Sequence, residues 1–465
     1  MPVAEVCAGA GHTACLLSAV AVETPAAVSL YTWGQGEDGQ LGHHDTEDIS
    51  RPREVADLAD VELEKVTCGA HHTIAVATAP EREVYAWGWG DFGRLGTGDP
   101  GDRHAPTPVR ALRGVHVEHV ACGDSHCLVV ARDGTLFSFG RNQNGQLGLG
   151  DSEDRLSPCV VQFFRDAGTR VRRAAGGAEH SAVTDARGAM YTFGWGRYGN
   201  LGHGHARDLH VPTLVESLKG QHVTDPICGW RHSAALTDQG RLWTFGWSKY
   251  GQLGHGDCVD HWTPKLLPEF AGGPVTAASG GWRHMCALAG STGTLYAWGW
   301  NHFGQLGTGS REDANAPREV VVGVGARRAV KAVACGWRHT VAVAGDDDEV
   351  YTWGAVRERA ARSRGHRAAG DAREGGGARF AAARHRAGGR RRREKRGEEA
   401  AADRAGRHAR AQPETTRRRL RRRAGLVTTR GVREEAAGCR AAPVFCVCET
   451  PFERLCFGRR CKDGT

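Results

Sequence analysis

The sequence predicts an all-β fold, a seven-bladed β-propeller whose last blade is incomplete and which is followed by a disordered basic tail. Two short motifs recur seven times, and the spacing of the first varies only from 52 to 60 residues. The 465 residues include 65 glycines and 13 tryptophans, which indicates many tight turns beside large aromatic anchors. Between the motifs lie short alternating runs of strand length without helical periodicity. Four short strands per period fit a ring of radially arranged sheets.

The first motif is a glycine followed three residues later by a histidine. In every repeat this motif lies at the end of a short run of small residues. Its seven copies are Gly9 to His12, Gly69 to His72, Gly123 to His126, Gly177 to His180, Gly229 to His232, Gly281 to His284 and Gly336 to His339.

The second motif is an aromatic residue followed by glycine, which opens into a glycine-rich turn and ends in leucine-glycine. Glycine supplies backbone angles that residues with a Cβ resist, and the aromatic ring has the size to fill the wedge between neighbouring sheets. The copies begin at Trp33, Trp87, Phe139, Phe193, Phe245, Trp298 and Trp353. The last copy stops at Gly354 without a leucine-glycine pair, so we expect the seventh blade to be incomplete.

The charge of the chain divides at residue 355. Residues 1–355 carry 30 Lys+Arg and 40 Asp+Glu, whereas residues 356–465 carry 31 and 13, so the net charges are about −10 and +18. We therefore expect residues 1–355 to form the propeller and residues 356–465, rich in Arg, Ala and Gly, to form a disordered tail. Two interpretations of the tail stay open. It is either a basic segment for nucleic-acid binding or nuclear import, or the product of a shifted reading frame or a retained intron in a GC-rich gene.

The glycine turns resemble those of the regulator of chromosome condensation repeat family, because Gly-Gln-Leu-Gly occurs at residues 39–42, 145–148, 251–254 and 304–307. Within that family, residues 1–354 are similar to the ultraviolet-B photoreceptors of plants and algae. Three consecutive repeats carry Gly-Trp-Arg-His, at residues 229–232, 281–284 and 336–339, and the turns at 88–93, 140–145 and 194–199 agree as well. The resemblance implies the same propeller and the same light-sensing function.

Three tryptophans occupy a position that blade packing does not explain: Trp230, Trp282 and Trp337. At this position the other four repeats carry Ala10, Ala70, Asp124 and Ala178, so the fold does not require an indole there. Each of the three is followed by an arginine, namely Arg231, Arg283 and Arg338. A guanidinium beside an indole is stabilising and perturbs the electronic states of the ring. Since indole absorbs at ultraviolet-B wavelengths, the cluster is a candidate chromophore that needs no cofactor.

The resemblance assigns roles to these and to further tryptophans. It implies that Trp282 and Trp230 are the principal light sensors, that Trp337 supports them, and that Trp89 approaches from a partner subunit. It also implies a surrounding aromatic ring that passes excitation inward, formed by Trp195, Trp247 and Trp300.

Charged residues in the same loops predict a self-complementary dimer interface. The acidic residues are Glu37, Asp38, Glu47, Asp91, Asp102, Asp124, Glu153 and Glu179. The basic residues are Arg141, Arg197, Lys249, Arg283 and Arg338. Segregated signs on one face allow two copies to pair about a two-fold axis. The resemblance implies cross-subunit pairs of Arg283 with Asp91 and Asp102, of Arg141 with Glu179, and of Arg338 with Glu37.

No metal site and no catalytic site emerge from the sequence. One histidine per blade should hold the seven histidines apart, and Cys68, Cys122, Cys228 and Cys335, which recur just before the first motif, are interpreted as packing thiols. The sequence shows no nucleophile–base pair and no phosphate loop, so we expect no enzyme activity. The longest apolar run near the start, residues 14–22, is too short to span a bilayer, so we expect no membrane association.

The leading hypothesis is therefore a homodimeric ultraviolet-B photoreceptor that releases signalling monomers on illumination. The resemblance implies a WD-repeat ubiquitin ligase and WD-repeat repressors as partners, chromatin as a further one, and a location in cytoplasm and nucleus. An alternative is a guanine-nucleotide exchange factor or chromatin-associated propeller of the same repeat family. A third is a scaffold that binds proteins through its loops. The shared fold does not decide among them.

Overall fold

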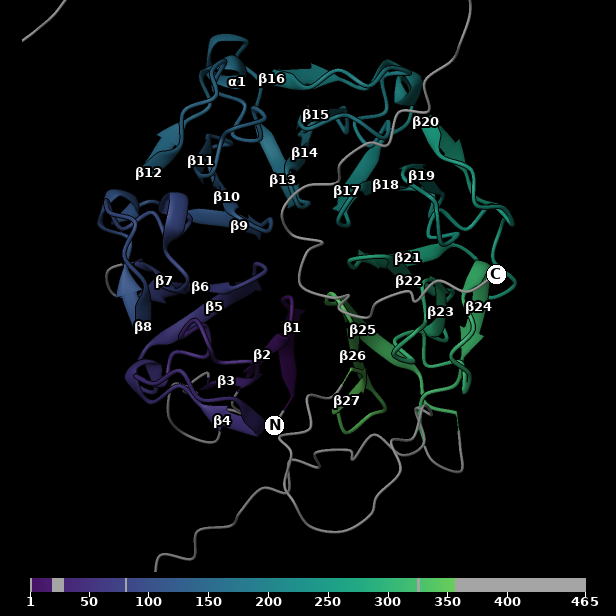
Figure 1. The fold of residues 1–465 in the computed structure, drawn as a ribbon, viewed down its shortest axis with the longest axis horizontal. Helices are drawn as coiled ribbons and strands as arrows, with labels where there is room; N and C mark the ends of the chain where they lie inside the picture. The colour runs from purple at the N-terminus through teal and green to yellow at the C-terminus, as the bar shows by residue number, and fades with distance from the viewer. Residues whose placement is uncertain (1, 19–28, 80–81, 324–326, 356–465) are drawn as a thin grey trace, which may run out of the picture. The chain divides into compact units, whose positions relative to one another are not determined.

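A computed structural model describes residues 2–18, 29–79, 82–323 and 327–355 of the chain. In these residues seven antiparallel sheets stand side by side around a central axis (Figure 1), which confirms the all-β, seven-bladed propeller. The predicted basic tail, residues 356–465, lies outside the described residues.

Each of the first six blades has four strands in chain order, with the first strand innermost, and blade 7 has three strands among the described residues. The strands of blades 1 to 3 are β1 (Val3–Ala8), β2 (His12–Leu17), β3 (Ser29–Gly34), β4 (Ile49–Glu54), β5 (Glu62–Cys68), β6 (His72–Ala79), β7 (Val84–Gly88), β8 (Arg103–Pro108), β9 (Val117–Cys122), β10 (His126–Ala131), β11 (Leu136–Gly140) and β12 (Arg155–Val160). Those of blades 4 to 7 are β13 (Val171–Gly176), β14 (His180–Asp185), β15 (Met190–Gly194), β16 (Leu209–Leu214), β17 (Val223–Cys228), β18 (His232–Thr237), β19 (Leu242–Gly246), β20 (His261–Leu266), β21 (Val275–Gly280), β22 (His284–Ala289), β23 (Thr294–Gly299), β24 (Ala314–Val320), β25 (Val330–Cys335), β26 (His339–Ala344) and β27 (Glu349–Gly354). The helices are short: η1 (Ala56–Leu58), η2 (Asp91–Gly93), η3 (Arg110–Leu112), α1 (Gln162–Asp166) and η4 (Glu216–Leu218).

The hydrophobic core is divided among the contacts between neighbouring blades. The cluster between blades 1 and 2, for example, joins Leu16 and Leu30 of the first sheet to Val66 and Trp87 of the second. Trp87 is fully buried, as expected for the aromatic that fills the wedge between sheets. Burial of apolar area therefore depends on neighbouring blades staying together, as in other repeat arrays.

A three-part hydrogen-bonded latch joins most neighbouring blades. The Nε2 atom of the motif histidine contacts a hydroxyl or thiol at the start of the second strand of the next blade. This hydroxyl or thiol then donates a hydrogen bond to a backbone carbonyl in the glycine turn of the blade that carries the histidine. The complete latches are His12–Thr73–Gln40, His72–Cys127–Arg94, His126–Ser181–Gln146, His180–Ser233–Asn200 and His284–Thr340–Gln305. Because the hydroxyls donate to the carbonyls, they accept from the histidines, which fixes an Nε2–H tautomer.

The latch is incomplete at two junctions. Between blades 5 and 6, Met285 occupies the place of the hydroxyl, and both ring nitrogens of His232 are buried without a hydrogen-bond partner among the described residues. Between blades 7 and 1, His339 reaches Thr13 at 3.1 Å, but the turn that would offer the carbonyl follows Gly354, outside the described residues. The motif histidines therefore have a structural role, as the sequence indicates.

The ring closes although blade 7 has only three described strands. Strand β1 packs against β25 and β26 (Figure 1), and Cys15 and Trp33 of blade 1 share a core cluster with Val341 and Val350 of blade 7. The inner strands therefore supply the closing contact, and the outer strand is not needed for it.

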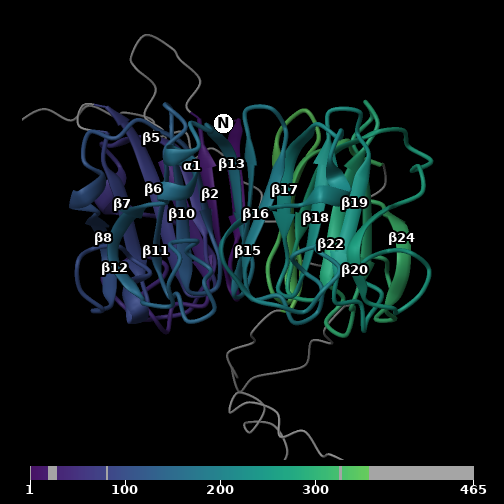
Figure 2. The same cartoon turned by 90° about the horizontal axis from the view of Figure 1, so that it is seen from above.

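Both sequence motifs lie on one face of the ring, which we call the loop face. In every blade the motif histidine pairs with the glycine of the second motif across neighbouring strands, as in His72 with Gly88. Gly88 has φ +110°, and a Cβ there would lie 2.4 Å from the carbonyl oxygen of His71, so only glycine fits. The short helices that follow the outer strands lie at the opposite ends of the blades, as the side view indicates (Figure 2).

Candidate functional site

The residues between glycine and histidine of the first motif form a circle of loops on the loop face. At every junction of the described blades except that of blades 2 and 3, the amide of the residue after the glycine donates to a backbone carbonyl in the next blade's loop, as from Trp230 to Gly281, from Trp282 to Gly336 and from Trp337 to Gly9. This backbone circle places equivalent side chains of neighbouring blades next to each other. It explains why a residue repeated in three consecutive blades forms a cluster.

The three predicted chromophore tryptophans are in contact. The ring centroids of Trp230 and Trp282 are 5.5 Å apart at 65°, and those of Trp282 and Trp337 are 5.6 Å apart at 22°, which is a stacked arrangement. All three are partly exposed, in contrast to Trp87 and Trp298 of the blade cores. Trp282 is the central member, because it contacts both of the others.

The arginines of the same motif lie over these rings. The guanidinium carbon of Arg231 is 3.7 Å from the centre of Trp230, and that of Arg283 is 3.9 Å from Trp282 and 5.3 Å from Trp230. Arg338 lies 5.3 Å from Trp282. Cation–π contacts of this kind contribute about 0.5–2 kcal/mol each. The predicted pairing of guanidinium with indole is thus present in the structure.

Arg283 is partly buried, whereas Arg338 is exposed. Burial lowers its pKa, the neighbouring Tyr250 raises it, and the charges of Arg231 and Arg338 lower it again. Its Nη1 donates to the hydroxyl of Tyr250 at 2.8 Å, and its Nε is buried without a partner among the described residues. No carboxylate lies within ion-pair distance of Arg283 in the described part of the chain, so its charge is balanced by aromatic rings and a phenol.

The predicted outer ring of tryptophans surrounds the central three. Trp247 is 5.6 Å from Trp230, and Trp300 is 5.5 Å from Trp282. Trp195 lies 5.0 Å from the Arg231 guanidinium carbon, so an arginine connects it to the centre. Tyrosines fill the spaces between these indoles: Tyr198 lies between Trp195 and Trp247, and Tyr250 between Trp247 and Trp300.

Trp89 belongs to a second cluster on the same face. A histidine, His71, lies edge-on between Trp89 at 5.6 Å and Trp337 at 5.7 Å, and its Nδ1 is 2.8 Å from the Asp38 carboxylate. Arg94 lies 4.0 Å from the centre of Trp89. Within one chain, therefore, Trp89 is separated from Trp337 by a single imidazole. Its approach from a partner subunit stays a prediction.

Asp124 connects this second cluster to Trp337. Burial raises the pKa of its carboxyl to about 6, the charge of Glu179 adds to this rise, and His71, a hydrogen bond from Trp337 and the charge of Arg94 oppose it. Asp124 occupies the loop position at which blades 5 to 7 carry tryptophan. The hydrogen bond between Trp337 and Asp124 thus connects the tryptophans of blades 5 to 7 with the acidic residues of blades 1 to 3.

The predicted dimer charges lie on the loop face in two settings. Glu37, Glu47, Asp91, Asp102, Glu153, Arg197, Lys249 and Arg338 are exposed, and Asp38, Asp124, Arg141, Glu179, Arg231 and Arg283 are partly exposed. Arg141 and Glu179 are 3.5 Å apart within one chain, whereas the resemblance implied a pair across subunits. Lys249 lies 5.9 Å from the ring centre of Tyr250. The cross-subunit pairs stay predictions.

Asp102 also has a structural role that the sequence analysis missed. Its Oδ1 accepts a hydrogen bond from the amide of Gly90 at 2.8 Å. The same bond forms in each of the first six blades, always with the aspartate twelve residues after the donor: Asp48, Asp102, Asp154, Asp208, Asp260 and Asp313. This constant spacing was visible in the sequence and could have identified these aspartates as turn residues.

The structure places cysteines beside two of the motif histidines, although the histidines themselves stay apart. Neighbouring blades bring His72 together with Cys122 and Cys127, and His284 together with Cys286 and Cys335, with the potential ligand atoms of each group within 4.8 Å. The spacing of histidines along the chain did not reveal this, because the cysteines come partly from the next blade. Each group could hold a soft metal ion through one nitrogen and two sulfurs, and the sequence prediction that no metal binds is left untested.

The repeats and the propeller define the class of this protein. The family model for the regulator of chromosome condensation repeat matches residues 29–76, 83–130, 133–184, 187–236, 239–288 and 292–343. The chain therefore belongs to the regulator of chromosome condensation repeat family.

Among curated proteins, the chain is 48% identical to the ultraviolet-B receptor UVR8 of Arabidopsis thaliana over 347 residues, which cover 75% of this chain and 76% of the relative. This confirms the resemblance to plant ultraviolet-B photoreceptors. Among solved structures, human WBSCR16 aligns with a TM-score of 0.64 at 24% identity, covering 74% of this chain and 87% of that one. Prp20p of Saccharomyces cerevisiae aligns with a TM-score of 0.63 at 20% identity, covering 74% and 84%. These two likenesses show the fold alone.

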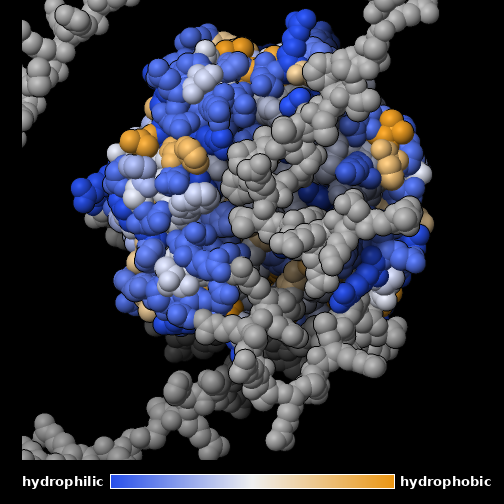
Figure 3. Space-filling model, in the orientation of Figure 1, coloured by the Kyte–Doolittle hydropathy of each residue, from blue (hydrophilic) through white to orange (hydrophobic). Residues whose placement is uncertain are grey.

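Within the described ranges, no helix has the length and the apolar character needed to cross a bilayer. The surface seen in Figure 3 is mainly hydrophilic, with separate hydrophobic spots near the rim. The exposed large hydrophobic residues among those described come from the outer strands, from helix α1 and from loops beside them: Leu156, Phe163, Val211, Val259, Trp262, Leu266 and Val321.

Proposed function

We propose that this chain is an ultraviolet-B photoreceptor whose chromophore is the cluster of Trp282, Trp230 and Trp337. The single observation that carries the proposal is the position of Trp282, stacked on one indole, in edge contact with another and covered by Arg283 at 3.9 Å. The 48% identity to a protein named as an ultraviolet-B receptor supports it. The chromophore is intrinsic, so the proposed receptor requires no added cofactor and catalyses no reaction.

In the proposed mechanism, the dark state is a homodimer joined through the loop faces. The basic side of one copy, with Arg283 and Arg338, meets the acidic side of the other, with Asp91 and Asp102, and the two-fold axis repeats this contact. Both arginines also lie over Trp282. Excitation that changes the charge distribution of the indole therefore weakens the contacts that these same guanidinium groups make across the interface. Absorption of light leads to dissociation.

The proposal extends to partners only through the resemblance. Monomers would bind a WD-repeat ubiquitin ligase and WD-repeat repressors, act on chromatin, and move between cytoplasm and nucleus. The segment 356–465, interpreted either as a basic nucleic-acid or nuclear-import tail or as the product of a shifted reading frame or a retained intron, lies outside the described residues.

Size-exclusion chromatography before and after ultraviolet-B exposure tests the proposal. We expect a dimer in the dark and a monomer after exposure, at protein concentrations where the dark dimer is stable. An unchanged elution volume would contradict it. Light-independent release of nucleotide from a Ran-type GTPase would instead favour the exchange-factor alternative, and a negative result in both assays would favour the scaffold.

A further inference from the structure

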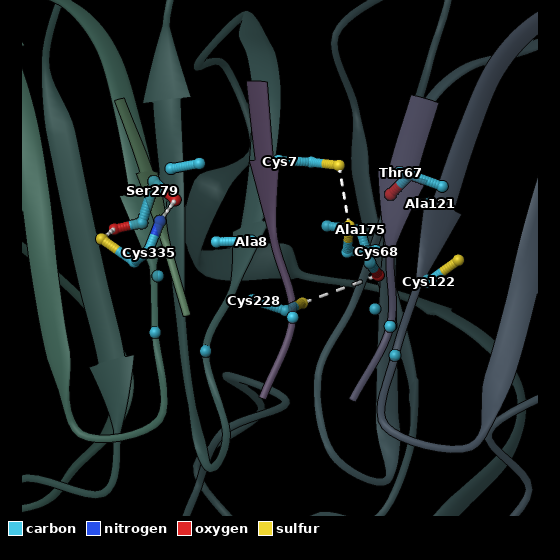
Figure 4. A pocket seen from close by; sticks show the side chains of 18 of the residues that line it. Cys7, Ala8, Thr67, Cys68, Ala121, Cys122, Ala175, Cys228, Ser279 and Cys335 are labelled. Atoms are coloured by element: carbon cyan, nitrogen blue, oxygen red, sulfur yellow. Dashed lines mark hydrogen bonds between the residues drawn. The ribbon is translucent and has the colours of Figure 1, made fainter. Parts of the chain in front are cut away.

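A ring of thiols lines the central channel of the propeller. The inner strands enclose a cavity of about 410 Å³, and Figure 4 shows the side chains that face it. The thiols are Cys7, Cys68, Cys122, Cys228 and Cys335. None of them has a role in the light-sensing cluster described above.

Two of these thiols form an unusually close pair. The Sγ atoms of Cys7, in β1, and Cys68, in β5, are 2.9 Å apart (Figure 4). By comparison, Cys122 and Cys127, which face each other across two strands of one blade, have sulfurs 3.6 Å apart. A disulfide bond measures about 2.05 Å, so a small movement brings Cys7 and Cys68 to bonding distance. The pair joins different blades, 61 residues apart in sequence.

The two thiols differ chemically. Burial alone would raise the pKa of Cys68, but the hydrogen bond with Cys7 and the nearby His12 ring lower it below its usual range. Burial and the neighbouring Cys68 raise the pKa of Cys7. The thiolate form is the nucleophile in thiol–disulfide exchange. Cys68 therefore has the character of the attacking thiol and Cys7 that of the resolving thiol.

We propose that Cys7 and Cys68 form a redox-active dithiol that exchanges with small aliphatic disulfides entering the channel. The Cys68 thiolate attacks one sulfur of the small disulfide, the S–S bond breaks, and one small thiolate leaves and takes a proton from solvent. Cys7 then loses its proton to solvent and attacks the Cys68 sulfur of the mixed disulfide, which releases the second small thiolate. Two protein thiols are oxidised, and one small disulfide is reduced to two thiols.

The crosslink would act on residues that support the second cluster of the loop face. Cys68 lies three residues before His71, and Cys7 lies two residues before Gly9, whose carbonyl accepts the amide of Trp337. The disulfide would bind the ends of β1 and β5 covalently at the junction of blades 1 and 2. Closing a long loop in this way stabilises the folded state chiefly by restricting the unfolded chain. Oxidation should therefore raise the melting temperature, independently of light.

Mass spectrometry of the full chain tests the proposal. The reduced protein is incubated with bis(hydroxyethyl) disulfide, quenched with acid and alkylating reagent, and digested. We expect a peptide pair joined through Cys7 and Cys68, and a higher melting temperature for the oxidised protein. Absence of that peptide pair under conditions that oxidise other cysteines would overturn the proposal.

Two variants test the order of attack, with a third as the matched control. Cys7→Ser should keep the mixed disulfide on Cys68, whereas Cys68→Ser should slow adduct formation on Cys7 by about tenfold or more. Serine is tolerated at the strand position of Cys7, because Ser279 occupies it in blade 6. Cys122→Ser should leave the Cys7–Cys68 bond unchanged. If Cys68 in the Cys7→Ser variant and Cys7 in the Cys68→Ser variant formed the mixed disulfide at equal rates, the assigned roles would be contradicted.

Discussion

Blades 5 to 7 and blades 1 to 3 present the same loop to the same face, yet they fill its second and third positions differently. Blades 5 to 7 place tryptophan and arginine there, and these side chains stack into one cluster. Blades 1 to 3 place Ala10, Ala70 and Asp124 at the second position, with carboxylates in the neighbouring turns. The strands and the glycine turns are alike on both sides. In the proposed photoreceptor, function thus depends on two side-chain positions per blade at which the fold accepts different residues.

The largest effect is expected from removing the central indole of the aromatic side. Trp282→Phe should abolish dissociation by ultraviolet-B while the dark dimer persists, because phenylalanine preserves much of the packing and absorbs little at these wavelengths. Elution volume before and after exposure is the measurement. Trp298→Phe is the matched control, since Phe139, Phe193 and Phe245 already occupy its blade position in three repeats. A normal light response in Trp282→Phe would show that the cluster is not the chromophore.

The second effect concerns Arg283, whose positive charge is proposed to pair with acidic residues of the other subunit. Arg283→Ala should weaken the dark dimer by about 2–5 kcal/mol, because it removes a desolvated charge from a paired interface. Analytical ultracentrifugation in the dark measures the dissociation constant. Arg110→Ala, at an exposed position in η3 on the opposite face, should change nothing. A dimer of unaltered affinity in Arg283→Ala would place the interface elsewhere.

The smallest effect concerns the acid that takes the place of tryptophan in blade 3. The pKa of Asp124 in the fold, about 6, lies above its usual 3.8, so the fold favours the protonated form. That contribution to stability is complete below pH 3.8 and is lost as the pH rises through 6. At pH 7.5 Asp124→Asn should therefore be more stable than the parent by about 1–2 kcal/mol, since the residue is only partly buried.

Denaturant unfolding of Asp124→Asn and its parent at pH 7.5 and at pH 4 measures this difference, which should nearly vanish at the lower pH. If Asp124→Asn lowered the free energy of unfolding equally at both pH values, the carboxylate would be needed for structure, and its ionisation would not destabilise the fold.

The sequence predicted the propeller, the shared face and the contact among Trp230, Trp282 and Trp337, because a motif repeated in consecutive blades must bring equivalent side chains together. It did not predict the contribution of His71, Arg94 or Tyr250. His71 and Arg94 occur in positions where the other repeats carry different residues, so no periodicity marks them. Tyr250 has an equivalent in Tyr198 of blade 4, and this repeated tyrosine could have identified it. The sequence also did not predict that blade 7 contacts blade 1 through its described strands, since this depends on packing of β1 against β25 and β26.

The incomplete latch between blades 5 and 6 has a consequence for where the ring opens. Local opening begins where stabilising contacts are fewest, and Met285 leaves both ring nitrogens of His232 without a hydrogen-bond partner among the described residues. The backbone bond from Trp230 to Gly281 still crosses this junction. Trp230 and Trp282 lie on its two sides, so a local opening there would change the distance between these two indoles.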